Sequence, residues 1–303
     1  MKNVVLITGA TGMIGSKLAS LCLDEGMTVH YFTRDKNKIV STDNFCGFYW
    51  NPQNNEMDMA AFEGVEAIIH LAGAPIAKRW TSSYKQEIID SRIQPIRLMY
   101  ENLAQIPHSV DHFITASGIN IYPDSATKLY TEEDMERSDN FITSVVEQWE
   151  AEGGRFKELG MEVSKIRTGM VLAREGGVLP TLSKPIKFGL GSPLGSGEQW
   201  QSWIHIDDIV GIYMFVLQNT MEGIYNAVAP NPVKNKRLVH LIAEKLNKPL
   251  WLPAVPSFVL KTVLGEMGSL PLESQLISSN KLKKVGYVFK YPNVEPALDD
   301  LLT

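Results

Sequence analysis

Cysteine is scarce in this chain of 303 residues, and its scarcity excludes two common ways of holding a fold together. Cys22 and Cys46 are the two cysteines, and one isolated pair provides neither a disulfide framework nor the ligand spacing of a metal site. Cys22 lies in an apolar helical pattern and Cys46 in an aromatic run, so we expect both to be reduced packing residues. The sequence therefore predicts no bound metal and a fold that depends on its apolar core.

Long apolar runs and an excess of positive charge are missing as well. No stretch reaches the roughly 18 apolar residues that a membrane helix needs, and the run at residues 1–8 is too short for the core of a signal peptide. The net charge is −5, so neither nucleic acid nor an anionic membrane is expected as a partner. These absences predict a cytoplasmic protein. The partner that we expect is a small molecule, and the sequence leaves open whether the protein is a monomer or a homodimer.

The first half of the chain alternates short β-rich runs with helical patterns. Apolar or β-rich runs predict strands at residues 4–7, 28–33, 48–50, 67–71, 113–117 and 163–167, and helical periodicity predicts helices at 14–23, 81–105 and 144–159. Strands that alternate with helices in this way pair in parallel and carry helices on both faces. We expect a doubly wound α/β fold of the Rossmann type.

The second half has a different pattern. Residues 169–203 are rich in glycine and proline and are predicted to form an ordered loop, of which residues 176–201 would close over a cleft. Helices are predicted at 209–217, 236–246, 258–264 and 295–302, with one strand at 224–228. We expect a Rossmann domain over residues 1–170 and a smaller C-terminal α/β lobe over 171–303, from which roughly residues 205–230 return to the first domain.

A glycine-rich loop between the first strand and the first helix carries the strongest signal. Gly9, Gly12 and Gly15 have the spacing Gly-x-x-Gly-x-x-Gly. In a dinucleotide-binding loop the first glycine allows a tight turn, the second lets the backbone approach a pyrophosphate, and the third lets the helix pack on the strand. The amides at the start of the helix then bind the phosphates. A strand before the loop and an amphipathic helix after it favour this interpretation over a purely structural turn.

The second predicted strand ends at Thr33 and is followed by Arg34. A site that prefers NAD usually has an acidic residue here for the ribose 2′-hydroxyl, whereas a guanidinium can bind a 2′-phosphate. The sequence favours NADP, with the alternative that Arg34 is a surface charge and Asp35 supplies the carboxylate. A third segment, His70–Ala74, ends a strand with small residues against which a cofactor could lie, although a plain strand-to-loop turn explains it equally well.

Together these segments resemble the extended short-chain dehydrogenase/reductase superfamily and, more narrowly, its atypical "epimerase family protein" group. Members of that group are similar to sugar-nucleotide epimerases and have a C-terminal domain of unassigned role. The resemblance covers nearly the whole chain and is carried by residues 8–15, 70–73, 79–80, 91–92, 149–150, 167–172, 189–191, 195–199 and 202–208, with shorter matches beyond them.

The resemblance implies an NADP cofactor and the residues that contact it. On the residues alone, Glu87 and Arg92 would be ordinary charges on a solvent-facing helix, and the resemblance reverses that interpretation. The implied cofactor residues are Gly9, Thr11, Gly12, Met13, Ile14, Gly15, Thr33, Arg34, Leu71, Ala72, Gly73, Glu87, Arg92, Ser117 and Val171.

The chain departs from the superfamily where chemistry is expected. Typical members use a serine and a Tyr-x-x-x-Lys pair, in which the lysine lowers the pKa of the tyrosine. Ser117 is in place, but the resemblance aligns Val146 with the tyrosine and Glu150 with the lysine. A carboxylate there would raise the pKa of a nearby tyrosine instead of lowering it. Tyr122 remains as a substitute acid/base beside Ser117, and we favour a packing role for it.

The segment His205–Asp208 is also polar but lacks further ligands at metal spacing. We expect Asp207 or Asp208 to cap the helix that begins at residue 209. Three functions remain open. They are an NADP-dependent oxidoreductase or epimerase acting on a carbonyl or sugar-nucleotide-like compound, a non-catalytic NADP(H)-binding redox sensor or regulator, and an interaction protein on a vestigial Rossmann scaffold.

Overall fold

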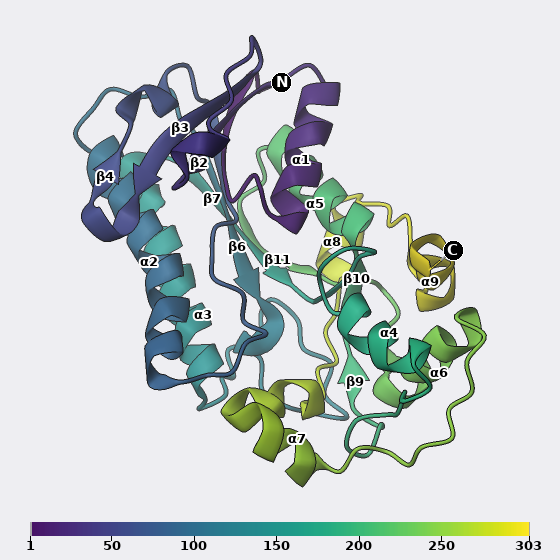
Figure 1. Cartoon of the computed structure of the whole chain (residues 1–303). Helices are drawn as coiled ribbons and strands as arrows, with labels where there is room; N and C mark the ends of the chain where they lie inside the picture. Colours follow the sequence, from purple (N-terminus) through teal and green to yellow (C-terminus); the bar gives the residue numbers. More distant parts are fainter. Residues whose placement is uncertain (1, 303) are drawn as a thin grey trace.

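One eight-stranded sheet forms the centre of the computed structural model, which describes residues 2–302 (Figure 1). The strand order is β11-β7-β6-β5-β1-β2-β3-β4, and every pair is parallel except the antiparallel pair β3–β4. The strands are β1 (Val4–Thr8), β2 (Thr28–Thr33), β3 (Phe45–Asn51), β4 (Glu56–Met57), β5 (Ala67–His70), β6 (His112–Gly118), β7 (Glu162–Thr168) and β11 (Gly223–Ala227). The predicted Rossmann-type fold is confirmed.

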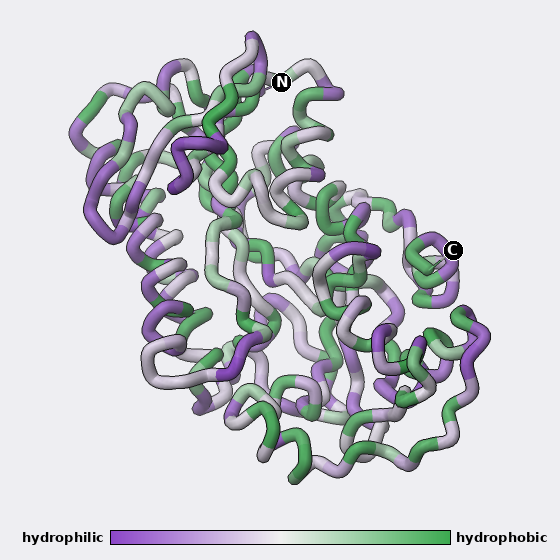
Figure 2. The backbone as a smooth tube through the Cα atoms, viewed as in Figure 1, coloured by the Kyte–Doolittle hydropathy of each residue, from purple (hydrophilic) through white to green (hydrophobic). Residues whose placement is uncertain are grey.

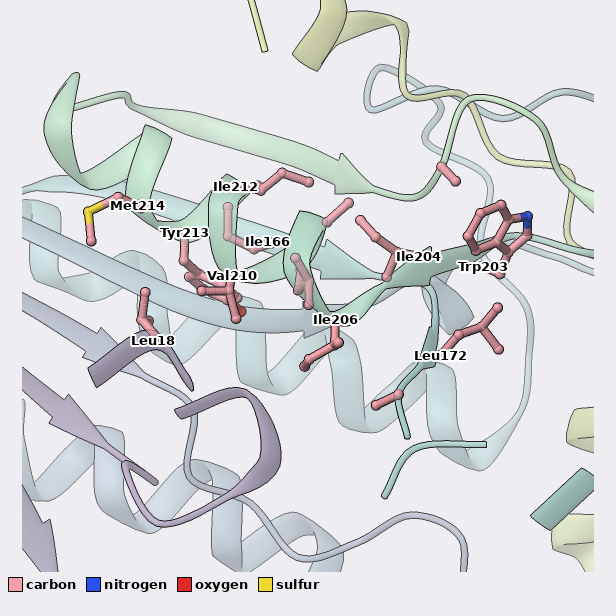
Figure 3. Packing of buried hydrophobic residues seen from close by; sticks show 14 of the residues in the cluster. Leu18, Ile166, Leu172, Trp203, Ile204, Ile206, Val210, Ile212, Tyr213 and Met214 are labelled. Atoms are coloured by element: carbon pink, nitrogen blue, oxygen red, sulfur yellow. The ribbon is translucent and has the colours of Figure 1, made fainter. Parts of the chain in front are cut away.

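Helices cover both faces of this sheet. The helices α1 (Met13–Asp24) and α5 (Ile206–Gln218) pack together on one face, and α2 (Ser82–Leu103) and α3 (Phe141–Gly154) pack together on the other. The central strands are apolar on both sides, as Val5, Leu6 and Ile7 of β1 show by being fully buried. Figure 3 shows the interior beside α5, where Ile166 of β7 lies among residues of that helix.

The helix boundaries follow local capping chemistry. Thr81 caps α2 by accepting a hydrogen bond from the amide of Tyr84, and Asn140 caps α3 in the same way. The predicted helix 144–159 is in fact α3 followed by a 3₁₀ segment, and it ends at Gly160, whose φ of 79° only glycine adopts readily.

The prediction of a loop over residues 169–203 was wrong in part. This segment contains β8 (Met170–Leu172), α4 (Leu179–Lys187), β9 (Trp200–Gln201) and the start of β10 (Trp203–His205). Prolines at 180 and 185 concealed the helix, although a proline is tolerated in the first turn of a helix. β8 pairs with β10, and β9 pairs with β12 (Val233–Lys234).

After β12 the chain is mainly helical, and its last helix lies close to the start of α5, since Oδ2 of Asp300 is 3.4 Å from Nε2 of His205. The helices after β12 are α6 (Asn235–Lys245), α7 (Ser257–Leu264), α8 (Asn280–Lys284) and α9 (Val294–Leu302), and α8 had not been predicted. The expected cap of α5 was also wrong. His205 is the cap, since its Nδ1 accepts from the amide of Asp207, whereas the Asp208 carboxylate accepts the amides of Lys290 and Tyr291.

Residues 2–302 hold neither a membrane-spanning helix nor a cluster of metal ligands. None of their helices combines the length and apolar character that crossing a bilayer requires. Nor do their histidine, cysteine and acidic side chains form a group of three or more that could hold a metal ion.

Candidate cofactor-binding and active site

The glycine-rich loop lies at the carboxyl edge of the sheet and has the close contacts that require glycine. Gly9 has φ of 73°, and Gly12 is the cap residue of α1, where no side chain occupies the helix end. A Cβ on Gly15 would lie 2.2 Å from the carbonyl oxygen of Gly9. The start of α1 is therefore packed tightly against β1 and leaves its first amides for an anion.

The loop after β5 lies directly against this glycine-rich loop. A Cβ on Gly9 would be 3.0 Å from the amide nitrogen of Ala72. The hydroxyl of Thr8, at the end of β1, accepts hydrogen bonds from the amides of Leu71 and Ala72 and lies 2.8 Å from Nδ1 of His70. The structure thus brings together the first and third segments that the sequence indicated.

Arg92 supports this second loop from behind. Its side chain is buried, its Nη2 donates to the carbonyl of Ala74 at 3.0 Å, and its guanidinium lies 5.0 Å from the centre of the Trp149 ring. Burial lowers the pKa of Arg92 to about 10. A Cβ on Gly73 would contact the guanidinium at 3.2 Å, so a larger residue would push the loop away. Glu87, on the same helix, is exposed.

The end of β2 presents an unpaired cation. Arg34 is exposed and has no hydrogen-bond or ion-pair partner among residues 2–302. Asp35, the alternative acidic residue, accepts the amide of Asn37 and so caps a short 3₁₀ turn. Thr33 is buried, and its hydroxyl accepts the amide of Asp35 at 3.1 Å.

A glycine turn of the C-terminal half contacts the loop as well. A Cβ on Gly176 would lie 3.0 Å from Sδ of Met13, and one on Gly177 would lie 2.5 Å from the carbonyl oxygen of Val171. Met13 and Val171, which are far apart in the sequence, are therefore joined by this turn. Of the remaining loop residues, Thr11 is exposed and Ile14 is half-buried.

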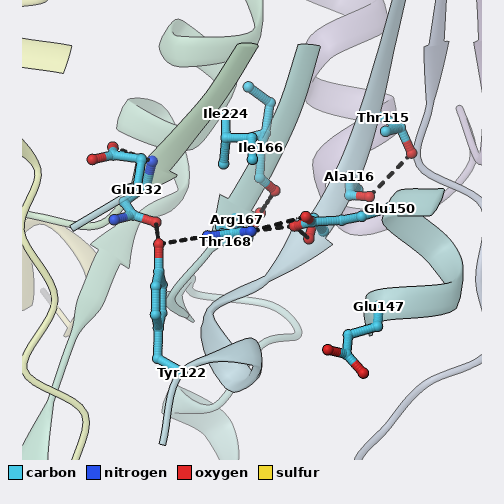
Figure 4. Close-up of polar contacts among 12 residues, drawn as sticks. Thr115, Ala116, Tyr122, Glu132, Glu147, Glu150, Ile166, Arg167, Thr168 and Ile224 are labelled. Atoms are coloured by element: carbon cyan, nitrogen blue, oxygen red, sulfur yellow. Dashed lines mark hydrogen bonds and ion pairs between the residues drawn. The ribbon is translucent and has the colours of Figure 1, made fainter. Parts of the chain in front are cut away.

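A buried polar network includes Ser117, Tyr122 and Glu150, the three residues compared above with the proton-transfer groups of the superfamily (Figure 4). Ser117 donates to Glu150 at 2.6 Å, and Arg167 donates to both oxygens of Glu150, from Nε at 2.7 Å and from Nη2 at 2.9 Å. Nη1 of Arg167 donates to the hydroxyl of Tyr122 at 2.7 Å, and that hydroxyl donates to Asn226 at 2.9 Å. All five residues are buried.

This network fixes the protonation of its members. Burial raises the pKa of Tyr122, and the nearby Arg167 opposes that rise without cancelling it, so the phenol stays protonated at neutral pH. Burial also disfavours the charge on Glu150, but the hydrogen bonds and charge of Arg167 outweigh it and hold the pKa of Glu150 below its ordinary value. Val146 is buried beside Tyr122 and has no proton to exchange.

Sequence reasoning missed Arg167 as the partner of Glu150. Two signals were present, because a charged residue in a central parallel strand and a charged residue on the inner face of a helix are each expensive to bury alone. What the sequence could not supply was their distance, because β7 and α3 meet only through tertiary packing.

The chain is similar to known proteins over nearly its full length. A family model described as the NAD dependent epimerase/dehydratase family matches residues 5–227, and a model of a domain of unknown function matches residues 255–301. An epimerase family protein of Staphylococcus haemolyticus is 35% identical over 98% of each chain, and one of Staphylococcus aureus is 34% identical over 98% of each.

Among solved structures, the human epimerase family protein with NADPH has a TM-score of 0.86, with 27% identity and 99% of each chain covered. A nucleoside-diphosphate sugar epimerase of Corynebacterium glutamicum has a TM-score of 0.78 and 27% identity, over 100% of this chain and 58% of that one.

Proposed function

The chain belongs to the NAD dependent epimerase/dehydratase family, as an atypical extended short-chain dehydrogenase/reductase of the epimerase family protein group, and on that basis we propose that it binds NADP(H) at the glycine-rich loop. The observation that carries the choice of NADP is Arg34. It is an exposed, unpaired guanidinium one residue beyond the end of β2. A 2′-phosphate would give it the bidentate partner that it lacks.

Each predicted residue has a place in this proposal. The pyrophosphate binds at the start of α1, over the six loop residues Gly9, Thr11, Gly12, Met13, Ile14 and Gly15. Thr33 and Arg34 bind the adenosine end. The backbone of Leu71, Ala72 and Gly73 lines the middle of the cofactor site, Arg92 holds that loop in position, and Glu87 faces the solvent side. Val171 and Ser117 lie toward the nicotinamide end.

The proposed chemistry is hydride transfer with a carbonyl or sugar-nucleotide-like compound, for which the nicotinamide supplies or accepts the hydride. Ser117 has already donated its hydrogen to Glu150, so its oxygen can only accept another hydrogen bond. Tyr122 is protonated, and its hydrogen is held by Asn226. When hydride from the nicotinamide reduces a carbonyl carbon, the proton that the product oxygen needs would therefore come from water, and in the reverse direction water would accept the proton of the alcohol, so we expect turnover to be slow.

The same network favours a second candidate function, in which the protein binds NADP(H) without turnover, as a redox sensor or regulator. A buried carboxylate–guanidinium pair is a stable structural unit and offers no group that titrates near neutral pH. The two candidates share one binding step and differ in whether the bound nucleotide reacts.

Titration of the purified protein with NADPH and NADH tests the binding step. Arg34→Asp should weaken NADPH binding at least tenfold and leave NADH binding nearly unchanged, because it removes the 2′-phosphate partner. Lys36→Asp is a matched control, since it makes the same charge change two residues further on. Equal losses for both nucleotides in Arg34→Asp would refute the assignment. Gly12→Val should abolish binding of both NADPH and NADH, because a bulky side chain would fill the phosphate site at the start of α1.

Absorbance at 340 nm then separates the two candidates. Stoichiometric NADPH–protein complex is mixed with a panel of carbonyl and sugar-nucleotide compounds, and oxidation is followed over one turnover. Loss of absorbance with any member of the panel supports hydride transfer. Unchanged absorbance with tight NADPH binding supports the sensor.

A further inference from the structure

Two segments of the C-terminal half contain no acidic residue, although the chain as a whole has 34. They are residues 176–197 and residues 245–265. Of the four acids that border them, Glu198 and Glu266 form ion pairs with Lys234 and Lys85, whereas the exposed Glu175 and Glu244 form no ion pair among residues 2–302. Of the five lysines within these segments, Lys245 forms an ion pair with Asp299, and the other four form no ion pair among residues 2–302.

The two segments lie side by side. The amide of Gly195 donates to the carbonyl of Val255, and the amide of Val255 donates to the carbonyl of Pro193. A Cβ on Gly191 would lie 2.8 Å from Leu250. The first segment contains α4 and the second contains α7. Both lie toward one end of the molecule, where the chain runs from α6 along the edge to α7 (Figure 1). We call the exposed side chains of these two segments the basic apolar patch.

Large apolar side chains protrude from this patch. Phe188, Leu190, Trp251, Phe258 and Val263 are 61–74% exposed, and they account for five of the ten exposed large apolar side chains among residues 2–302. No residue of α7 is buried. Along α4, Phe188 and Leu190 also line a groove of about 550 Å³. Figure 2 shows the resulting apolar colour along α7 and the adjoining chain.

Lysines without an ion-pair partner lie among these apolar side chains. Lys184, Lys187, Lys248 and Lys261 are exposed, and none has an ion-pair partner in the described range. Lysine is depleted in the cores of protein–protein interfaces, whereas lysine interspersed with tryptophan and phenylalanine is the composition of surfaces that lie in the headgroup region of a bilayer.

We propose that the basic apolar patch binds the surface of an anionic phospholipid bilayer, with its lysines on the headgroups and its aromatic side chains among the upper acyl carbons. The net charge of −5 would by itself repel such a surface, so attraction has to come from the local excess of lysine at this end of the molecule. The composition of the whole chain, which argued against a membrane partner, does not reveal this local distribution.

Sedimentation with lipid vesicles tests the proposal on the full chain. The protein should bind vesicles of phosphatidylcholine mixed with phosphatidylglycerol, bind phosphatidylcholine vesicles weakly, and be released at high salt. The double variant Lys184→Glu with Lys187→Glu should bind the anionic vesicles at least about tenfold more weakly, given the contribution of each lysine near such a surface. Trp251→Ser should also weaken binding, because it removes an interfacial anchor.

Lys283→Glu with Lys284→Glu is the matched control, since these lysines are exposed on α8, outside the patch. It carries the same charge change and should bind within about twofold of the parent, since it leaves the patch lysines in place. The proposal is overturned if the parent does not bind anionic vesicles, or if the two double variants lose binding equally. It is also overturned if the patch instead forms a dimer in sedimentation velocity that Trp251→Ser dissociates. Thermal melting curves establish that each variant is folded.

Discussion

Removing Arg167 should destabilise the protein more than any other single change in the buried network. The side chains of Arg167 and Glu150 are 1% and 9% exposed, and three hydrogen bonds leave the guanidinium. Arg167→Met keeps an unbranched apolar stem, removes the guanidinium and leaves Glu150 buried without its partner. Breaking one side of a buried ion pair costs about 3–5 kcal/mol. At roughly 2–3 °C per kcal/mol, the melting temperature should fall by about 6–15 °C.

Urea unfolding followed by circular dichroism measures this loss, and a double variant tests its cause. Glu150→Gln combined with Arg167→Met removes both charges, so it should be more stable than Arg167→Met alone by about 1–3 kcal/mol.

The contribution of the Glu150–Arg167 pair to stability depends on pH with a defined sign. The pKa of Glu150 is lowered in the folded protein, so the stability that the pair contributes is present above the ordinary value of 4.5 and is lost as pH falls below it. The difference between parent and Arg167→Met should therefore narrow toward pH 4.

Two results would refute this reasoning. A loss below about 1 kcal/mol for Arg167→Met would mean that Glu150 finds another partner or water. A double variant that is no more stable than the single one would mean that packing, and not the uncompensated charge, is responsible.

Two further changes have defined outcomes. Burial lowers the pKa of His70 to about 3 and that of His112 to about 4. Below pH 6.5 the unfolded chain therefore binds protons at these two histidines, whereas the folded chain does not. The free energy of unfolding should fall by about 2 kcal/mol between pH 6.5 and pH 5.5. His112→Asn should lose about half of that dependence in urea titrations at the two pH values, and a pH-independent parent would contradict the assignment. Gly15→Ala should lower both the melting temperature and NADPH affinity, because its Cβ would meet the carbonyl of Gly9 at 2.2 Å. Gly26→Ala, where nothing lies within 4 Å, should leave NADPH affinity unchanged, and equal affinity losses would argue against a specific role for Gly15.

Most elements of the first half could be predicted because each follows from a local pattern, whereas the two-residue strand β4 was not predicted. Val5, Leu6 and Ile7 form a run that only a doubly covered strand buries, and Gly160 marks the end of a helical segment by its backbone conformation. The helix α4 could not be predicted from its local pattern, because Pro180 and Pro185 interrupt the helical periodicity. It is stabilised by tertiary contacts, through Leu179 and Ile186, which are buried in the main core.

Caps and long-range polar pairs were less predictable, for a related reason. An aspartate before a helix is statistically a cap, but His205 takes that role because the Asp208 carboxylate is occupied by two amides of the segment that follows α8. The sequence marked Glu150 as a departure from the superfamily and gave no sign of what balances its charge. The charge of Glu150 is balanced by Arg167 of β7, and the two side chains meet only because α3 packs against β7.

The network has the same kinds of group as a superfamily active site, in a different arrangement. A serine, a tyrosine and a cation are all present, and the hydroxyl of Tyr122 accepts a hydrogen bond from Arg167 much as a catalytic tyrosine lies beside its lysine. Two differences decide the outcome. Tyr122 is only 1% exposed, and burial raises its pKa, so proximity to a cation does not make it an acid/base. The cation itself is paired with Glu150, which weakens the field that stabilises a phenolate, so Arg167 opposes the effect of burial without cancelling it. Glu150→Gln should therefore lower the pKa of Tyr122 by leaving Arg167 uncompensated, and a spectrophotometric titration of the phenols in parent and variant would detect it. An unchanged titration would mean that burial alone, and not the neutralised cation, keeps Tyr122 protonated.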